Sequence, residues 1–219
     1  MPKNVKLGII ICIVLVLGLG GVAIYQNAHK DDNLVKTVDR NLSQADRDTY
    51  TGRISAAQDS LDKSSNTDDK FNSYMTLAVN NYGLGQLEEA KKDYNEAVKL
   101  KPDTPTGYTG LFAVDQEMKD NAGAEAAIQK AISLQPANAG TWRQYIEFEK
   151  DVMHKSNAEI NDLYVQALGK TSNSVDVMTV YAEFLGSDGN LESAKEYWQK
   201  AIAANPAGKD LYQKEIDRL

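Results

Sequence analysis

Four alanines recur at a nearly constant interval in the C-terminal part of the chain. Ala97, Ala131, Ala167 and Ala201 are separated by 34, 36 and 34 residues. Each lies near the end of a stretch in which apolar side chains recur every three or four residues, the spacing of one face of an α-helix. A chain with this period folds into stacked copies of one short helical unit rather than around one large core.

Within each interval the side chains follow one order. A large residue is followed by an apolar and a small residue, and an alanine and an aromatic residue come later, in the second helix. Residues 71–104 contain this order as Tyr74, Leu77, Ala78, Ala90, Tyr94, Ala97 and the closing Pro102. The pattern resembles the tetratricopeptide repeat (TPR), a helix–turn–helix unit of 34 residues. The resemblance implies an all-α solenoid with four copies, 71–104, 105–138, 139–174 and 175–208, which together span 71–208.

The third copy departs from the pattern. Ile160 and Ser172 stand where an alanine and the closing proline are expected, and this copy is two residues longer than the others. We place the extra residues in the turn around 152–157, where His154 is expected to be a solvated loop residue. Residues 142–149 also resemble the half-a-TPR (HAT) variant found in RNA-processing scaffolds. The apolar N-terminal segment and the acidic charge described below argue against that role.

Small residues determine how closely the two helices of a copy approach each other. We therefore expect Ala78 to face Ala90, and the corresponding alanines of the fourth copy to do the same. Aromatic residues such as Tyr94 lie on the buried stripe at helical spacing, which favours a packing role over a ligand cage. Gly85 and Gly189 fall between the two helices of their copies, where a residue with positive φ closes the first helix.

The N-terminal part of the chain has the character of a membrane segment. Residues 7–25, LGIIICIVLVLGLGGVAIY, contain no charged side chain and are long enough to cross the hydrocarbon core of a bilayer. Residues 1–6 form a short basic tail with Lys3 and Lys6, which favours an N-terminus inside the cell. We interpret 7–25 as a transmembrane helix that acts as a signal anchor. The alternative is a signal peptide cleaved after the small residues 21–23.

Two further segments flank the repeats. Residues 26–70 predict a linker and a helical pair, which forms either a degenerate first repeat or a helical stalk. The two helical patterns comprise Leu34, Val38, Leu42 and Ala45, and then Tyr50, Ile54, Ala57 and Leu61. Residues 209–219, KDLYQKEIDRL, predict a C-terminal capping helix with Leu211 and Tyr212 on or near one face.

Charge and composition limit the partners and exclude several kinds of site. The chain has a net charge of −7, and its first 25 residues contain two lysines and no acid, so the remainder carries −9. An acidic surface repels phosphate backbones, so we expect no nucleic-acid partner. The one cysteine, Cys12, lies in the apolar segment, and the chain has two histidines. With no assembled constellation of reactive groups, we expect no catalytic residue, no metal site, no cofactor and no small-molecule substrate. The protein is therefore predicted not to be an enzyme.

The remaining function is binding. The TPR resemblance implies that the first helix of each copy lines a concave groove that holds a protein or peptide partner. The candidate groove residues are Thr76, Val79, Tyr82, Thr109, Ala113, Gln116, Arg143, Gln144 and Glu147. TPR proteins that bind chaperone tails have polar groups where Met75, Val79 and Gly110 stand here, so that activity is not implied.

These observations lead to one main prediction and two alternatives. We expect a single-pass protein of the cell membrane, with an extracytoplasmic C-terminal domain, that is similar to the TPR proteins assisting bacterial secretion or envelope assembly. It would act as a membrane-anchored adaptor or chaperone-like protein. One alternative is a structural or self-assembling solenoid spacer. The other is an intracellular TPR scaffold with the reversed topology.

Overall fold

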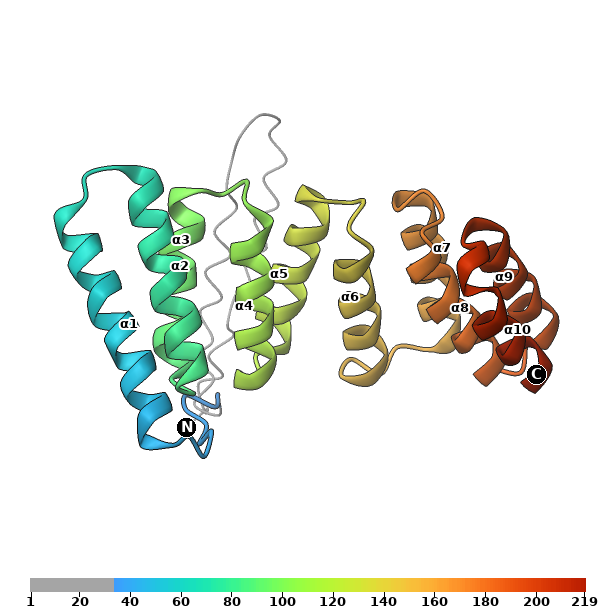
Figure 1. Ribbon diagram of the computed structural model, residues 1–219, viewed down its shortest axis with the longest axis horizontal. Coiled ribbons are helices and arrows are strands. Elements are labelled where there is room, and N and C mark those ends of the chain that lie inside the picture. The colour runs from blue at the N-terminus through green and yellow to red at the C-terminus, as the bar shows by residue number, and fades with distance from the viewer. Residues whose placement is uncertain (1–33) are drawn as a thin grey trace, which may run out of the picture. The chain divides into compact units, whose positions relative to one another are not determined.

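The computed structural model describes residues 34–219 (Figure 1). The predicted basic tail 1–6 and transmembrane helix 7–25 lie outside the described residues. Within 34–219 there are ten α-helices and one short 3-10 turn, and an isolated bridge is the only β-pairing. None of the helices in this part of the chain combines the length and the apolar character needed to cross a membrane.

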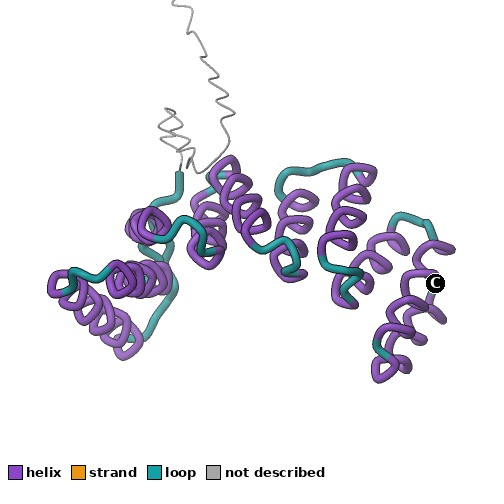
Figure 2. The backbone as a smooth tube through the Cα atoms, turned by 90° about the horizontal axis from the view of Figure 1, so that it is seen from above, coloured by secondary structure: helices purple, strands orange, loops and turns teal. Residues whose placement is uncertain are grey.

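Most of the helices form hairpins that follow one another along the array (Figure 2). The four hairpins are α2 (Thr67–Gly83) with α3 (Leu87–Leu100), α4 (Pro105–Met118) with α5 (Asn121–Leu134), α6 (Ala139–Asp151) with α7 (Asn157–Lys170), and α8 (Val175–Ser187) with α9 (Leu191–Ala204). The remaining elements are α1 (Gln44–Lys63) before them, and η1 (Pro206–Gly208) and α10 (Lys209–Arg218) after them. The predicted all-α solenoid is confirmed.

The repeat period is visible in the backbone angles. The C-cap residues that follow α3, α5 and α9 are Lys101, Gln135 and Asn205, with φ of −133°, −136° and −135° and ψ of 78°, 70° and 81°. Each precedes a closing proline, whose ring disfavours the helical conformation for the residue before it. In the third repeat, which lacks the proline, the chain instead turns through Ser172 and Asn173, both with positive φ. The sequence difference thus produces a different turn at the same place.

The third hairpin is also packed differently from the others. Ile146 and Ile160 are both buried between its helices, where the first and fourth repeats have pairs of fully buried alanines. Two branched side chains require more space, and α6 and α7 lie further apart than the helices of the other hairpins (Figure 1). The turn that joins them, residues 152–156, is longer than the corresponding turns and contains the exposed His154, as the spacing predicts.

The core consists of two apolar clusters, one in each half of the array. The first joins α2 to α5 and includes Ala78 and Ala90, both fully buried. The second joins α6 to α10. Phe148 belongs to α6 but packs in the first cluster, with its ring 5.5 Å from that of Phe112 and nearly perpendicular to it. This aromatic contact connects the two halves of the solenoid.

The C-terminal helix closes the second cluster. Tyr212 is buried and stacks on Trp198 of α9 with a ring separation of 5.8 Å. Leu211, which was expected on or near the same face as Tyr212, is 62% exposed. Adjacent residues of an α-helix point about 100° apart, and α10 turns Tyr212, rather than Leu211, toward α9.

The prediction of two helices within 26–70 is wrong. Among the described residues, α1 is the only helix before α2, and the expected first helix is absent from residues 34–43. Residues 34–40, here named the strap, are extended and form hydrogen bonds with other repeats. The Val35 N–H donates to the Met118 carbonyl at 3.0 Å, and the Val38 N–H donates to the Gly85 carbonyl at 2.9 Å. Leu34 and Val38, whose spacing suggested a helix, instead pack on the first core cluster together with Val35.

Replacing Gly85 with alanine is expected to detach the strap. Gly85 has a φ of +79°, and a Cβ there would lie 2.0 Å from the Val38 carbonyl oxygen. Gly189 is a matched control, because its φ is +82° but a Cβ would meet nothing within 4 Å. Gly189→Ala should cost about 1–2 kcal/mol of stability through backbone strain alone. Gly85→Ala should cost at least about 1 kcal/mol more, because strap hydrogen bonds are lost.

The two variants are compared by urea unfolding and by limited trypsin digestion. Cleavage after Lys36 or Arg40 should accelerate in Gly85→Ala and remain at the wild-type rate in Gly189→Ala. Equal cleavage rates in the two variants would contradict the assignment of Gly85 as the docking point of the strap.

Candidate partner-binding groove

A hollow with a volume of about 270 Å³ lies between α4 and α6, the first helices of the second and third repeats. Its lining consists of Thr109, Phe112, Ala113, Gln116, Gln144, Glu147, Phe148, Asp151 and Val152. We name this hollow the α4–α6 groove. Five of the nine sequence-predicted site residues lie together here: Thr109, Ala113, Gln116, Gln144 and Glu147.

The groove combines an apolar floor with a polar rim. Phe112 and Phe148 form the floor and are almost completely buried. Val152, at the end of α6, adds an apolar side chain that is 40% exposed. Gln116 and Gln144 supply amide groups from the two facing helices. An arrangement of this kind buries an apolar side chain of a partner while neighbouring polar groups orient it.

Negative charge gathers at the α6 side of the groove. Each carboxylate has a loose, exposed ion pair on the same helix, with Arg143 Nε 3.7 Å from Glu147 Oε1 and Lys150 Nζ 3.5 Å from Asp151 Oδ1. The same negative charge affects the pKa of Tyr164. Burial, and then the carboxylates of Glu147, Glu183 and Asp151, raise the pKa of Tyr164 to about 12. The rim therefore favours a cationic group of a partner over an anionic one.

Two family models match the chain. The model described as PRP39 N-terminal HAT repeat matches residues 92–216, more than half of the chain, and the tetratricopeptide repeat model matches residues 71–104. The chain belongs to the HAT and tetratricopeptide repeat family. It is a TPR protein–protein interaction module, a repeat scaffold of a class that is typically non-enzymatic.

Individual relatives agree on the repeat fold. The mouse (Mus musculus) interferon-induced protein with tetratricopeptide repeats 3 is 27% identical over 179 residues, which cover 74% of this chain and 43% of that protein. The chain thus spans less than half of the length of that relative. The crystal structure of MamA has a TM-score of 0.55 at 15% identity and covers 81% of this chain and 99% of its own. That of YrrB, described as a TPR protein with an unusual peptide-binding site, has a TM-score of 0.52 at 15% identity and covers 80% and 87%.

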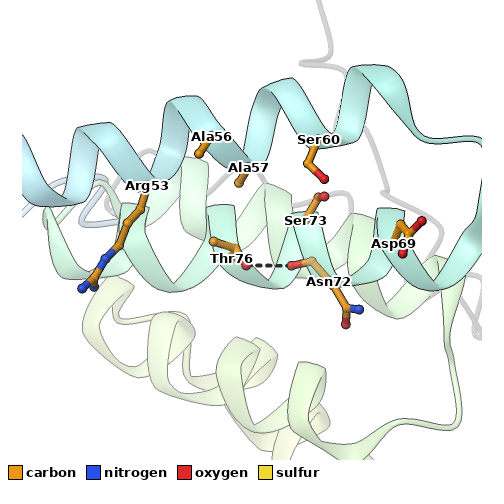
Figure 3. Close-up of a pocket in the computed structure, with 8 residues that line it drawn as sticks. All are labelled: Arg53, Ala56, Ala57, Ser60, Asp69, Asn72, Ser73 and Thr76. Carbon is orange, nitrogen blue, oxygen red and sulfur yellow. Dashed lines mark hydrogen bonds between the residues drawn. The ribbon is translucent and has the colours of Figure 1, made fainter.

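The other predicted site residues of the TPR array lie outside the α4–α6 groove. Thr76 lines a second hollow of about 350 Å³ between α1 and α2 (Figure 3). That hollow is lined by the side chains of Arg53, Ala56, Ala57, Ser60, Asp69, Asn72, Ser73 and Thr76. The Thr76 hydroxyl donates to the Asn72 carbonyl. Val79 is exposed on α2, and Arg143 is exposed on α6, where it lies beside Glu147.

Tyr82 was predicted as a groove residue that contacts a partner. In the structure the strap contacts it instead, through Arg40. Arg40 lies over the Tyr82 ring, 4.9 Å from its centroid, and its Nη2 donates to the Tyr82 carbonyl at 3.3 Å. The Tyr82 hydroxyl donates to Glu117, whose other carboxylate oxygen is 2.7 Å from Arg40 Nη2. Burial and the Glu117 contact raise the pKa of Tyr82 to about 12. The contact between Arg40 and Tyr82 was not predicted, because the spacing of Leu34 and Val38 indicated a helix in this segment.

Three buried polar side chains at 34-residue intervals were not recognised in the sequence. Asn81 Nδ2 donates to Asp93 Oδ2 at 2.7 Å, and Asp115 Oδ1 lies 2.7 Å from Lys91 Nζ. Glu149 is buried, and its Oε1 has no hydrogen-bond partner within residues 34–219. Burial raises the pKa of Asp115 to about 6. The signal that would have found these residues is the repeat period itself, since all three share one place in the first helix.

Reactive groups do not converge in the described part of the chain. Among residues 34–219, no group of three or more His, Cys, Asp or Glu side chains is arranged to hold a metal ion. The α4–α6 groove contains amides, a hydroxyl, carboxylates and apolar side chains. Its chemistry supports non-covalent binding of a partner.

Proposed function

We propose that this protein is a membrane-anchored TPR adaptor that holds a protein partner in the α4–α6 groove on the extracytoplasmic side of the cell membrane. The observation that carries the binding role is the convergence of Thr109, Ala113, Gln116, Gln144 and Glu147 on one hollow with an apolar floor. YrrB, which shares the fold, is described as having a peptide-binding site, and this is consistent with such a role.

The membrane location rests on residues 7–25. Their nineteen uncharged positions follow a basic tail, a pattern that favours a retained signal anchor with the C-terminal domain outside the cytoplasm. The solenoid would then recruit or chaperone a partner at the membrane surface, in envelope assembly or secretion. The acidic charge of −9 outside the first 25 residues is consistent with a protein partner rather than a nucleic acid.

One reagent tests both the location and the partner. The native Cys12 lies in the predicted anchor, so Gln144→Cys supplies a cysteine at the groove and Gln166→Cys supplies an exposed control on α7. Intact cells are treated with a membrane-impermeant maleimide that bears a photo-crosslinker. We expect labelling at both positions in intact cells, and capture of a discrete protein from position 144 only.

Three outcomes would contradict the proposal in different ways. Labelling that requires cell lysis would indicate the reversed topology of an intracellular scaffold. Capture of a second copy of this chain would indicate a self-assembling spacer. Identical capture from positions 144 and 166 would indicate that the α4–α6 groove is not the binding surface.

A further inference from the structure

The strap shows which chemistry the first-helix face of this solenoid binds. Arg40 lies between the Tyr82 ring of α2 and the Glu117 carboxylate of α4, at 4.9 Å and 2.7 Å. Val35 and Val38, a few residues before it, pack on the first core cluster. An extended segment with apolar residues and an arginine is therefore held by one position on each of two neighbouring repeats.

The same pair of positions occurs again one repeat later. Tyr82 and Glu117 correspond, at the 34-residue period, to Gln116 of α4 and Asp151 of α6. Both of these residues line the α4–α6 groove. The Gln116 amide oxygen and the Asp151 carboxylate are acceptors for a guanidinium or an ammonium group. The groove thus carries two hydrogen-bond acceptors at the positions equivalent to those around Arg40, with an amide where that site has the Tyr82 ring.

The geometry points to a cationic partner, and we infer that the α4–α6 groove binds an extended protein segment with a lysine or arginine close to a large apolar side chain. This inference rests on the proposed function. The cation would lie between Gln116 and Asp151, and the apolar side chain would contact the exposed Val152 above the floor of the groove. An acidic segment would instead meet Glu147 and Asp151 at the rim, and like charges at an interface oppose binding.

Glu147 and Asp151 have looser ion pairs on their own helix than the pair that Glu117 forms with Arg40. Lys150 Nζ is 3.5 Å from Asp151 and Arg143 Nε is 3.7 Å from Glu147, and all four side chains are at least 45% exposed. Exposed pairs of this kind contribute about 0–1 kcal/mol. A partner cation that is partly desolvated in the groove would therefore displace them at little cost.

The probe for this inference is a labelled synthetic peptide with the sequence of residues 34–43, LVKTVDRNLS. It is titrated into the full chain in detergent micelles and followed by fluorescence anisotropy. The strap is part of the same chain and therefore has a high effective concentration at its own site. The added peptide cannot easily displace it there, so its binding reports on the α4–α6 groove. We expect saturable binding that weakens at high salt, and at least about tenfold weaker binding of a peptide carrying Arg40→Glu.

Variants of the full chain locate the bound peptide. Asp151→Asn should weaken binding at least about threefold, and Gln116→Ala should also weaken it. Asp59→Asn, which removes the same charge from an exposed position on α1, should leave binding unchanged. Sensitivity to Glu117→Gln without sensitivity to Asp151→Asn would show that the peptide only displaces the strap, and would overturn the inference.

The remaining outcomes separate this inference from the proposed function. Absence of binding, or equal binding of the Arg40→Glu peptide, would overturn the cationic partner. Capture of a protein from position 144 whose cross-linked segment is acidic would do the same, while leaving the adaptor function intact. Failure of that capture, together with specific peptide binding, would contradict the adaptor function and leave the chemistry of the groove supported.

Discussion

Replacing Phe148 with alanine is expected to lower the free energy of unfolding by about 3–5 kcal/mol. Phe148 is 1% exposed, and its ring packs edge-on against Phe112 across the junction between the second and third repeats. Truncation leaves a cavity at the place where the two apolar clusters meet. Because each repeat of a solenoid is stabilised mainly by its neighbours, the loss should also uncouple the two halves.

Urea unfolding followed by circular dichroism and by tryptophan fluorescence distinguishes these effects. Trp142 and Trp198 both lie in the second cluster, so fluorescence reports on the C-terminal half while circular dichroism reports on all helices. The two signals should coincide in the wild-type protein and separate in Phe148→Ala. Val165→Ala, at a 52% exposed position on α7, should change stability by less than about 0.5 kcal/mol. Coincident transitions in Phe148→Ala would contradict its role as the junction.

Replacing Lys91 with methionine is expected to destabilise the protein by about 3–5 kcal/mol at pH 7.5. Lys91 Nζ lies 2.7 Å from Asp115 Oδ1 and 2.6 Å from Asp120 Oδ2. Burial lowers the pKa of Lys91, but the two carboxylates outweigh that effect and raise it. Methionine fills similar volume without the charge, so the buried Asp115 carboxylate loses its counterion.

The cost of Lys91→Met should decrease at pH 5. Burial raises the pKa of Asp115 from 3.8 to about 6 despite the opposing effect of Lys91. A raised pKa means that the folded state favours the protonated form of Asp115. This stabilisation is complete below about pH 3.8 and is lost as the pH rises through 6, which lowers the free energy of unfolding of the wild-type protein by roughly 3 kcal/mol. Without Lys91 the pKa of Asp115 should rise further, so Asp115 is neutral at pH 5 and needs no counterion.

Lys92→Met is the matched control for this prediction. Lys92 is the next residue on α3, its side chain is 72% exposed, and its Nζ lies 3.9 Å from the Glu89 carboxylate. It should change the free energy of unfolding by less than about 0.5 kcal/mol at either pH. An equal loss of stability in Lys91→Met at pH 5 and pH 7.5, measured by urea unfolding, would indicate that Lys91 contributes packing rather than charge.

Features that depend on local spacing were predictable from the sequence. The buried alanines, such as Ala78 and Ala90, repeat with the helix hairpin, and Gly85 and Gly189 have the positive φ expected of their turns. The extra residues of the third repeat lie in the predicted turn. Each of these inferences requires only helical periodicity and the special conformations of glycine and proline.

Features that depend on distant segments were not predictable in the same way. Leu34 and Val38 are spaced as in a helix, yet the strap is extended, because hydrogen bonds to Gly85 and Met118 compete with helix formation. Tyr82 was predicted to be available to a partner, but Arg40 and Glu117 contact it. The buried position shared by Asn81, Asp115 and Glu149 is occupied by a different polar group in each repeat, and each group requires its own partner.

By itself, the sequence determined the repeat class and the location of an irregular third repeat, because a fixed period constrains every copy to the same local packing. The tertiary structure decided where the strap binds on the first-helix face. The strap binds at the α2–α4 end through backbone hydrogen bonds and the Arg40 ion pair. Among residues 34–219, the α4–α6 groove, one repeat further along, is lined by α4, α6 and Val152 alone and contains the equivalent Gln116 and Asp151. Only the approach of a segment far away in sequence could distinguish these two otherwise related sites.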